Sequence, residues 1–567
     1  HDGAGHWKES YSEIFSGADV VIVQDNDDIG KKHAQTVAAS LFGKAARVRI
    51  VDLTKIDPSL PDKGDVTDYL ERSTSRQKAL QELKKLIDDT EPEKDPQKAV
   101  RAQGFIYNAE RHVPGTDAGA GYLFADSYKG QIKFAAKDWY IWNGKQWQKD
   151  EAGRVAQLAK KVPYELIPAL IRSITDTEEQ GELFKWARSL LNNKKRVEML
   201  IAAQSVEGIT QRLSDFDNDS RYFNLQNGIF DLEDLRLLPH DPEMLMTKIS
   251  PVMFNPSARC ERWDRFIMEI MNGDQELVDF LQMICGYSLL GDPVDDFMTI
   301  LYGSATRNGK STFCKALLNV FGDYGGSAQP ETLSENLHRN GSAPSPDVAR
   351  MAGLRFLHLP EPSKSMKFDA GLVKQLTGGD TIVARFLGRD PFEFTPCFAA
   401  VMSANHLPRV DDLTLFKSGR LITIPFNVSF TGESQDRTLL NQFKDPNAMS
   451  AIFNWCVEGL QRYRISRNGI KGNIPAGALE QIDEYEKSSD IFGQFLGDCV
   501  MKVHGAVTRL DSLYTAYTTW AEDNGYHPMS SKTFSSTMKE RGYFSHRAKK
   551  GFVFESVSLI DDREEQK

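Results

Sequence analysis

The sequence predicts a multidomain α/β protein. A chain of 567 residues is too long for one hydrophobic core, so three or four domains are expected. Short β-branched runs alternate with segments of helical periodicity near the start of the chain and again around residue 300, and this alternation is typical of parallel sheets covered by helices. At residues 303–312 a glycine-rich turn joins one such run to a helix, and it is the strongest local signal in the chain.

The composition is that of an ordinary soluble protein, with 40% hydrophobic and 26% charged residues. A net charge of −10 is unlike that of a protein that coats DNA, although it leaves room for local basic loops. The cysteines are far apart and form no C-x-x-C pair, which argues against a zinc site or a disulfide framework and fits a reducing compartment. They are Cys260, Cys285, Cys314, Cys397, Cys456 and Cys499.

The sequence shows neither a signal peptide nor an apolar run long enough to cross a bilayer. We therefore expect a cytoplasmic or nuclear protein with no membrane partner. The chain opens at His1 without an initiator methionine, as a fragment of a longer protein would.

The first 90 residues begin with a predicted βαβ unit, in which strands at 18–23 and 46–51 flank a helix at 31–42. Asp25 and Asp27 follow the first strand, at the edge where open α/β sheets place their sites. Two carboxylates at this spacing could share a Mg²⁺ ion, and a solvated acidic loop is the alternative.

The middle of the chain starts with a charged, proline-containing linker at residues 91–96. The aromatic run at 139–147 predicts a hairpin, residues 155–209 have helical spacing, and 222–232 predict another strand and turn. The hairpin tryptophans could stack on single-stranded bases or form the core of a small sheet, and the second alternative is favoured. They are Trp139, Trp142 and Trp147.

The glycine-rich turn fits the phosphate-binding pattern G-x-x-x-x-G-K-[ST], with a buried strand at 297–302 before it and a helix at 313–321 after it. Its backbone N–H groups would face a polyphosphate at the helix N-terminus. Lys310 would reach the β- and γ-phosphates, and Ser311 would hold Mg²⁺. The predicted ATP-binding residues are Gly303, Ser304, Ala305, Thr306, Arg307, Asn308, Gly309, Lys310, Ser311 and Thr312.

Three polar residues needed by an ATPase follow in order along the chain. Glu361 comes after a strand at 354–359, where an acid would polarise the attacking water. Asn405 follows a strand at 396–402 and could sense the γ-phosphate. Arg420 precedes a further strand and could reach the nucleotide of a neighbouring subunit. The alternatives are an ordinary surface acid, a turn-forming asparagine and a surface arginine.

Between the acid and the asparagine, residues 381–394 alternate like a β-hairpin with its tip near Gly388. A basic hairpin with aromatic residues suits contact with a nucleic-acid backbone, whereas surface arginines that serve solubility are the alternative. The predicted DNA-facing residues are Lys374, Arg385 and Arg389.

The C-terminal segment predicts a winged helix. Helices at 491–500, 510–524 and 530–541 precede two strands around a basic turn at 543–554, and the third helix would enter a major groove. Winged helices also dock proteins, which is the alternative. The residues that could contact phosphates are Lys532, Arg547, Lys549 and Lys550.

The order of the phosphate loop, FLHLPE, LTGGDTIVARFLGRD, VMSANHLP and GRLITIPF resembles a superfamily 3 helicase of the phage/plasmid primase type. The segments WYIWNGKQW and FNLQNGIFDLEDLRLLPHDP are similar to the region that precedes this motor in phage/plasmid and poxvirus primase–helicases, where its role is to form a collar. The runs VVIVQDNDDIGKKHA and KGDVTDYL resemble the second half of a Toprim domain, in which D-x-D binds catalytic Mg²⁺.

The resemblance implies an AAA+-like motor that forms a hexameric ring and binds ATP between subunits. It also implies hairpins in a central channel and 3′-to-5′ translocation on single-stranded DNA. Glu361 would be the Walker B acid, Asn405 the sensor and Arg420 the finger. The chain departs from the family at Pro360, where many relatives have a second acid, and at Gly419, where relatives often have a second arginine. In the Toprim family an upstream glutamate completes the metal site, so we expect the primase centre to be incomplete in this chain and its other half to lie in a longer native protein.

These inferences predict a partial Toprim domain at 1–90, a linker and collar-forming domain at 91–265, a helicase domain at 266–475 and a winged helix at 485–567. The predicted function is an ATP- and Mg²⁺-dependent helicase on single-stranded and forked DNA, acting in phage, plasmid or mobile-element replication. The winged helix could bind origin DNA. Two alternatives remain open: an initiator that melts an origin without processive unwinding, and a Toprim nuclease–ATPase of a defence system.

Overall fold

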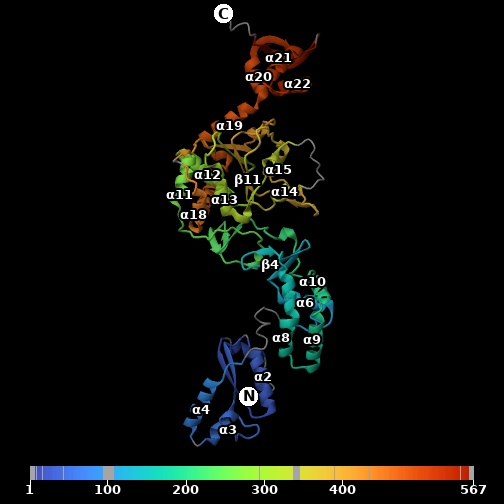
Figure 1. Ribbon diagram of the computed structural model, residues 1–567, viewed down its shortest axis with the longest axis vertical. Coiled ribbons are helices and arrows are strands. Elements are labelled where there is room, and N and C mark those ends of the chain that lie inside the picture. The colour runs from blue at the N-terminus through green and yellow to red at the C-terminus, as the bar shows by residue number, and fades with distance from the viewer. Residues whose placement is uncertain are drawn as a thin grey trace. The chain divides into compact units, whose positions relative to one another are not determined.

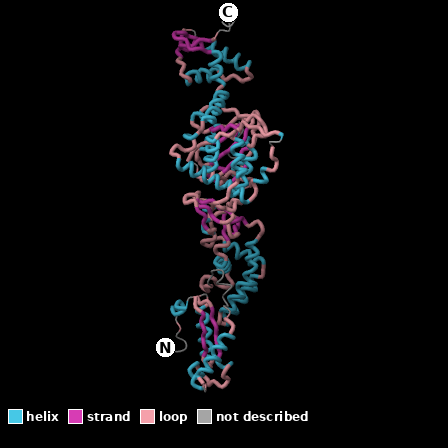
Figure 2. Tube along the Cα trace, turned by 90° about the vertical axis from the view of Figure 1, so that its left-hand side faces the viewer, coloured by secondary structure: helices cyan, strands magenta, loops and turns pink. Residues whose placement is uncertain are grey.

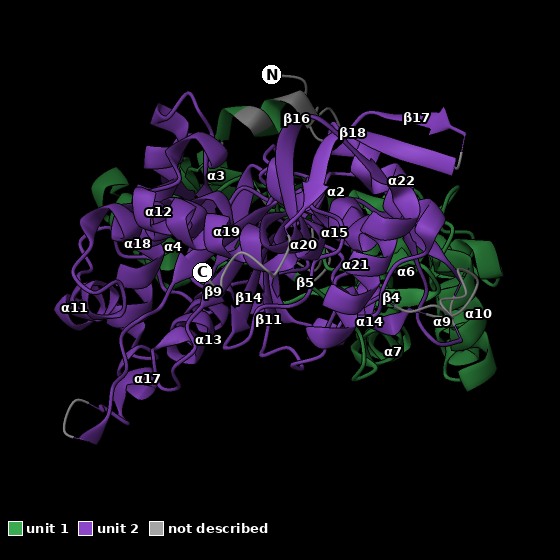
Figure 3. Ribbon diagram, turned by 90° about the horizontal axis from the view of Figure 1, so that it is seen from above, with its two compact units in different colours: residues 1–143, 147–215 green, residues 144–146, 216–567 purple. Residues whose placement is uncertain are grey.

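The structure is a computed structural model. It describes residues 7, 9–15, 17–42, 44–73, 75–93, 107–292, 294–335, 345–388, 390–432, 435–549 and 551–560. Two compact units, coloured separately in Figure 3, are His1–Asn143 with Trp147–Asp215 and Gly144–Gln146 with Phe216–Lys567. Within the described ranges, no helix combines the length and apolarity needed to cross a membrane.

The first unit opens with a parallel strand pair. β1 (Asp19–Gln24) pairs with β2 (Arg47–Asp52), and α2 (Asp28–Leu41) connects them, which confirms the predicted βαβ unit. Helix α2 begins where it does because the Asp27 carboxylate accepts the Gly30 backbone N–H. The other elements here are α1 (Glu9–Ser12), η1 (Glu13–Phe15), η2 (Leu53–Lys55), α3 (Val66–Arg72) and α4 (Arg76–Asp89).

A helical layer with a small antiparallel sheet completes the first unit. The sheet consists of β3 (Ile132–Ala135), β4 (Asp138–Trp142) and β5 (Trp147–Lys149), and the β4–β5 pairing confirms the predicted aromatic hairpin. The Trp147 side chain is fully buried, and its ring centroid lies 5.6 Å from that of Trp142. This packing agrees with the alternative in which the hairpin tryptophans form the core of a small sheet. The helices are α6 (Asp117–Ser127), α7 (Arg154–Lys161), η3 (Val162–Leu166), α8 (Ile167–Ser173), α9 (Thr177–Leu190) and α10 (Asn193–Ala203).

A second antiparallel sheet belongs to the second unit. It consists of β6 (Tyr222–Leu225), β7 (Gly228–Asp231) and β8 (Arg236–Leu238). The rings of Phe223 and Phe230 pack 5.5 and 5.3 Å from Phe453, so the sheet shares one core with helix α18 (Pro446–Ile465). The division between the units falls after residue 215, because this sheet buries its apolar face in the second unit. The domain bounds expected from the sequence stay predictions.

A parallel sheet with the order β10-β11-β14-β9-β15 forms the centre of the second unit. It confirms the strands predicted at 297–302, 354–359 and 396–402. Because the strands are parallel, their carboxyl ends meet at one edge, and the residues that follow β9, β11 and β14 are brought together there. The strands are β9 (Met298–Tyr302), β10 (Gly325–Ser327), β11 (Phe356–Leu359), β14 (Ala399–Ala404) and β15 (Leu421–Pro425).

Helices cover both faces of the parallel sheet, as Figures 1 and 2 show. One face packs against α11 (Glu261–Ile270), α12 (Gln275–Tyr287), α13 (Lys310–Phe321) and α18. The other packs against α14 (Pro346–Ala349), α15 (Ala370–Thr377) and α16 (Thr414–Lys417). Short elements of the same unit are η5 (Pro242–Met244), η6 (Gly322–Tyr324), η7 (Pro330–Leu333), α17 (Leu439–Gln442) and η9 (Lys471–Asn473), whereas η4 (Leu213–Asp215) belongs to the end of the first unit.

The predicted hairpin and the C-terminal helices are also present. β12 (Ile382–Ala384) pairs antiparallel with β13 (Phe392–Phe394). In the C-terminal part, β16 was not predicted, because most of its side chains are exposed and it carries no apolar alternation. The C-terminal elements are α19 (Ala476–Ser489), α20 (Ile491–Cys499), β16 (Val500–Arg509), α21 (Leu510–Asp523), α22 (Ser531–Glu540), β17 (Ser545–Ala548) and β18 (Gly551–Leu559), with the sheet order β16-β18-β17.

Candidate nucleotide-binding site

The glycine-rich loop leaves β9 at Tyr302 and enters α13 at Lys310. Gly309 has φ +89°, and a Cβ there would lie 2.4 Å from a methyl carbon of Ile270. A Cβ on Gly303 would lie 2.3 Å from the Phe426 carbonyl oxygen. Gly309 therefore requires glycine because of its positive φ and because a side chain would collide with Ile270. Gly303 requires glycine because a side chain would collide with the backbone of Phe426.

The Asn308 side chain closes the loop from inside. Its amide nitrogen lies 2.9 Å from the Ala305 carbonyl oxygen, 3.4 Å from that of Gly303 and 3.3 Å from that of Phe426. Asn308 is 4% exposed. One buried amide thus joins both ends of the loop to the segment after β15.

Three sequence-predicted residues meet at the carboxyl edge of the sheet. The Lys310 ammonium donates to the Asn405 side-chain oxygen at 2.7 Å and to the Gly303 carbonyl at 2.9 Å. The Asn405 backbone N–H donates to the Glu361 carboxylate at 2.7 Å. Burial lowers the pKa of Lys310 to about 8, and the Glu361 charge partly opposes this shift. The structure therefore places a cation, an amide and an acid within one hydrogen-bonded chain.

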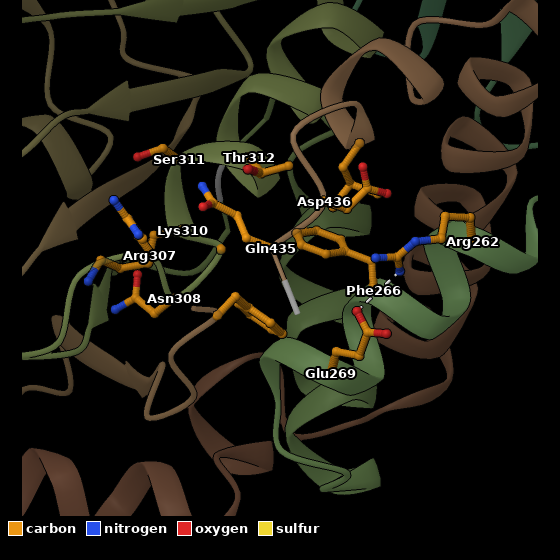
Figure 4. A pocket seen from close by; sticks show the side chains of 13 residues that line it. Arg262, Phe266, Glu269, Arg307, Asn308, Lys310, Ser311, Thr312, Gln435 and Asp436 are labelled. Carbon is orange, nitrogen blue, oxygen red and sulfur yellow. Dashed lines mark hydrogen bonds and ion pairs between the residues drawn. The ribbon is translucent and has the colours of Figure 1, made fainter. Parts of the chain in front are cut away.

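A cavity of about 250 Å³ opens beside the loop. Figure 4 shows Lys310, Ser311 and Thr312 on one side of it, and Phe266 with the Arg262–Glu269 ion pair on the other. The lining residues on α11 were not predicted, because pocket-facing side chains on an amphipathic helix have the same spacing as core residues. The others lie in the segment after β15 and at the start of α17, where no motif marks them. The missed lining residues are Arg262, Phe266, Glu269, Phe430, Gln435, Asp436 and Leu439.

Two predicted cations are already paired within the chain. Arg420 donates to the Thr377 hydroxyl at 2.7 Å and forms an ion pair of 2.7 Å with Asp296, leaving 17% of its side chain exposed. Lys374 forms an ion pair of 2.8 Å with Asp412. Their roles as a finger and as a DNA contact stay predictions, and each would require these contacts to open.

The remaining predicted residues lie away from the cavity. Arg385 is half-buried in the β12–β13 connection, and Arg389 and Lys550 fall outside the described residues. In the C-terminal part, three of the predicted phosphate contacts have exposed side chains: Lys532, Arg547 and Lys549.

Asp25 and Asp27, the predicted Mg²⁺ pair, follow β1. Burial and the carboxylates of Asp65 and Asp27 raise the pKa of Asp25, while Asp27 caps α2. Across the described part of the chain, no cluster of three or more His, Cys, Asp or Glu side chains is arranged to hold a metal ion. Metal binding at this pair stays a prediction.

Fold and site together define an α/β protein with a phosphate-binding loop on a parallel sheet. Three family models match the sequence: "D5 N terminal like" at residues 121–272, a family of unknown function (DUF5906) at 301–420, and "Poxvirus D5 protein-like" at 487–558. These matches confirm the resemblance to primase–helicases of the poxvirus D5 type.

Curated relatives come from viruses, and each is named "Putative helicase". The protein of Acanthamoeba polyphaga mimivirus is 25% identical over 55% of this chain and 34% of its own length. That of Frog virus 3 is 24% identical over 44% and 26%, and that of Invertebrate iridescent virus 6 is 23% identical over 55% and 35%. The chain therefore spans about a third of the length of these relatives or less.

Among solved structures, the apo structure of NrS-1 C terminal region (305–718) aligns with a TM-score of 0.44 and 11% identity, covering 77% of this chain and 99% of that one. An A form apo structure of the same region aligns with a TM-score of 0.36 and 13% identity, covering 66% and 80%.

Proposed function

We propose that this chain is the motor part of a primase–helicase and acts as an ATP-dependent helicase of the superfamily 3 type in the DNA replication of a virus or other mobile element. The observation that carries the proposal is the meeting of Lys310, Asn405 and Glu361 at one edge of the parallel sheet. An NTPase needs a cation for the phosphates, a polar sensor and an acid for the attacking water. In this chain the three arrive from α13, β14 and β11.

The strand order supports the same assignment. β14 lies between β9 and β11, so the sensor candidate stands between the phosphate loop and the acid. This order suits the AAA+-like motor that the sequence motifs indicate. ATP would lie with its phosphates on the loop and its base toward the apolar wall of the cavity that includes Phe266 and Leu439.

Oxygen ligands suit Mg²⁺, and the residues present fit such an ion. Ser311 lines the cavity at the start of α13, and Glu361 lies at the adjoining strand end. The Ser311 hydroxyl would hold Mg²⁺ with phosphate oxygens and water, and Glu361 would orient the attacking water. Bound Mg²⁺ would neutralise charge on the transferring phosphoryl group.

The β12–β13 hairpin is the proposed contact with single-stranded DNA. Exposed apolar side chains at its tip, Phe386 and Leu387, adjoin Arg385, and Phe386 stacks on Phe392 with ring centroids 5.8 Å apart. Aromatic and basic groups together suit bases and phosphates. In a hexameric ring, Arg420 would have to leave Asp296 to reach a neighbour's γ-phosphate.

A forked DNA duplex tests the proposed function. We expect ATP-dependent strand separation by the wild-type chain and none by Lys310→Ala, because unwinding requires the hydrolysis cycle. Gel or fluorescence separation of a labelled fork measures this. ATP hydrolysis that depends on Lys310 without any unwinding would reject the helicase and favour the origin-melting initiator, for which the exposed cations Lys532, Arg547 and Lys549 would supply duplex contacts.

Proton uptake on ATP binding is a second expectation. With a pKa of about 8, Lys310 is mostly neutral at about pH 9 before ATP binds and becomes charged beside the phosphates. Binding at that pH should take up roughly one proton, and almost none at about pH 7, where the ammonium is already charged. Calorimetry in buffers of different ionisation enthalpy measures the uptake. Lys310→Arg is the matched control, since a guanidinium stays protonated at both pH values; equal uptake by that variant would contradict the assignment.

A further inference from the structure

A buried chain of polar side chains lies directly behind the phosphate loop. The Ser403 hydroxyl is 3.0 Å from His358 Nε2 and 3.6 Å from Cys314 Sγ. The three residues are 5%, 8% and 0% exposed, respectively. A single hydroxyl can donate to one of these neighbours and accept from the other, so it satisfies both at once.

The three partners belong to the three elements that deliver the proposed ATPase residues. Ser403 lies in β14, two positions before the sensor candidate. Cys314 lies in α13, one turn after the phosphate-loop lysine and on the same helix face. His358 lies in β11, just ahead of the candidate acid. The chain therefore connects these elements through side chains within the protein core.

Packing alone does not call for polar residues here. Buried apolar side chains dominate this face of the sheet, among them Phe356, Val401 and Leu301, and the buried Thr299 lies on it as well. Burial lowers the pKa of His358 to about 4, so the imidazole is neutral at neutral pH and can share a hydrogen bond without a buried charge. When every group in a buried polar network has a hydrogen-bond partner, the main effect of the network is to select one arrangement of the helices and strands that carry it. Its contribution to the free energy of unfolding is secondary.

We infer that Ser403 is a positioning residue for ATP hydrolysis: its hydroxyl holds β11, β14 and α13 in the register that brings Lys310, Asn405 and Glu361 together. The inference rests on the proposed function and goes beyond it, because Ser403 is buried behind the loop and is not among the residues that line the cavity. The expected signature is a change in turnover with nucleotide affinity preserved, since a small misplacement of reacting groups costs rate before it costs binding.

The experiment compares Ser403→Ala with Ser450→Ala. Ser450 is also buried, accepts the Asn255 backbone N–H at 2.8 Å and donates to the Asn255 carbonyl at 3.2 Å, but it lies in α18. Both variants lose two hydrogen bonds and should show similar falls in the unfolding midpoint. Ser403→Ala should lower kcat for ATP about 10- to 30-fold with KM within about twofold. Ser450→Ala should leave kcat within about twofold.

A coupling measurement adds a readout that a merely structural role would not move. His358→Phe removes the imidazole nitrogen but keeps an aromatic ring, and it should lower kcat like Ser403→Ala. The double variant should be no slower than the slower single variant, because both single variants remove the Ser403–His358 hydrogen bond. Should Ser403→Ala fail to fold, His358→Phe carries the test. A kcat within twofold of wild type for the folded variants, or an equal loss in Ser450→Ala, overturns the inference.

Wild type and Lys310→Ala are assayed beside these variants. If the wild type shows no ATP hydrolysis that depends on Lys310, the proposed function itself has failed and the positioning role falls with it. If that hydrolysis is present and Ser403→Ala matches wild type, only the positioning role has failed.

Discussion

Replacing Lys310 with alanine should lower the rate of ATP hydrolysis about 100- to 1,000-fold, the loss expected when a preorganised donor to developing phosphate charge is removed. Lys310 is the buried cation of the loop, 4% exposed and held by Asn405 and Gly303. A steady-state assay of phosphate release measures the effect. A variant that retains more than about a tenth of wild-type turnover would contradict the assignment.

Lys315→Ala is the matched control for this prediction. Lys315 lies in the same helix but is exposed to solvent, so its loss should leave hydrolysis within about twofold of wild type. The unfolding midpoint separates chemistry from folding. Burial lowers the pKa of Lys310, which means that the folded state disfavours the charge on this side chain. Its removal should therefore not lower the unfolding midpoint sharply. A sharp fall in the midpoint would point to a folding defect instead of lost catalysis.

Arg355→Ala should lower the free energy of unfolding of the second unit by about 3–5 kcal/mol. The buried guanidinium donates to the Leu289 carbonyl at 2.6 Å and to the Tyr222 carbonyl at 2.7 Å. It also lies over the ring of Tyr324, 4.9 Å from the centroid. Its loss would leave one buried and one partly buried carbonyl without this donor and open a cavity between β11, β6 and the end of α12.

Hydrogen exchange of slowly exchanging amides in α12 and β11 measures this loss without assuming that the whole chain unfolds in one step. Arg462→Ala is the control, because Arg462 pairs with Asp279 at 2.8 Å with 48% of its side chain exposed. That exposed ion pair should contribute less than about 1 kcal/mol to the free energy of unfolding. A cost below about 1 kcal/mol for Arg355→Ala would show that the carbonyls find other partners or water.

The core of the site could be predicted from sequence because its signals are local. The run before Gly303 and the spacing of the helix after Lys310 each depend on a few neighbouring residues, and both elements are present. The meeting of Glu361 and Asn405 at one edge follows from a rule about parallel strands, so it too was within reach.

Other features depend on contacts between distant segments and left no local pattern. Arg420 was predicted to project toward a neighbouring subunit, but its pairing with Asp296 could not be seen, because an acid more than a hundred residues away in sequence has no fixed spacing from it. Nothing in the sequence around Arg355 marks it as buried, although it is 5% exposed. The division after residue 215 likewise has no local sign in the sequence, since it depends on which core receives the apolar face of β6 and β7.

The internal amide of Asn308 has a thermodynamic consequence. Its bonds to the carbonyls of Gly303, Ala305 and Phe426 lie within the chain, so they hold the loop backbone in one shape without help from a ligand. Ligands that find a preorganised site are spared the conformational entropy of ordering it. Loop ordering should therefore contribute little to the entropy of nucleotide binding, and association should proceed without a slow rearrangement of the loop backbone.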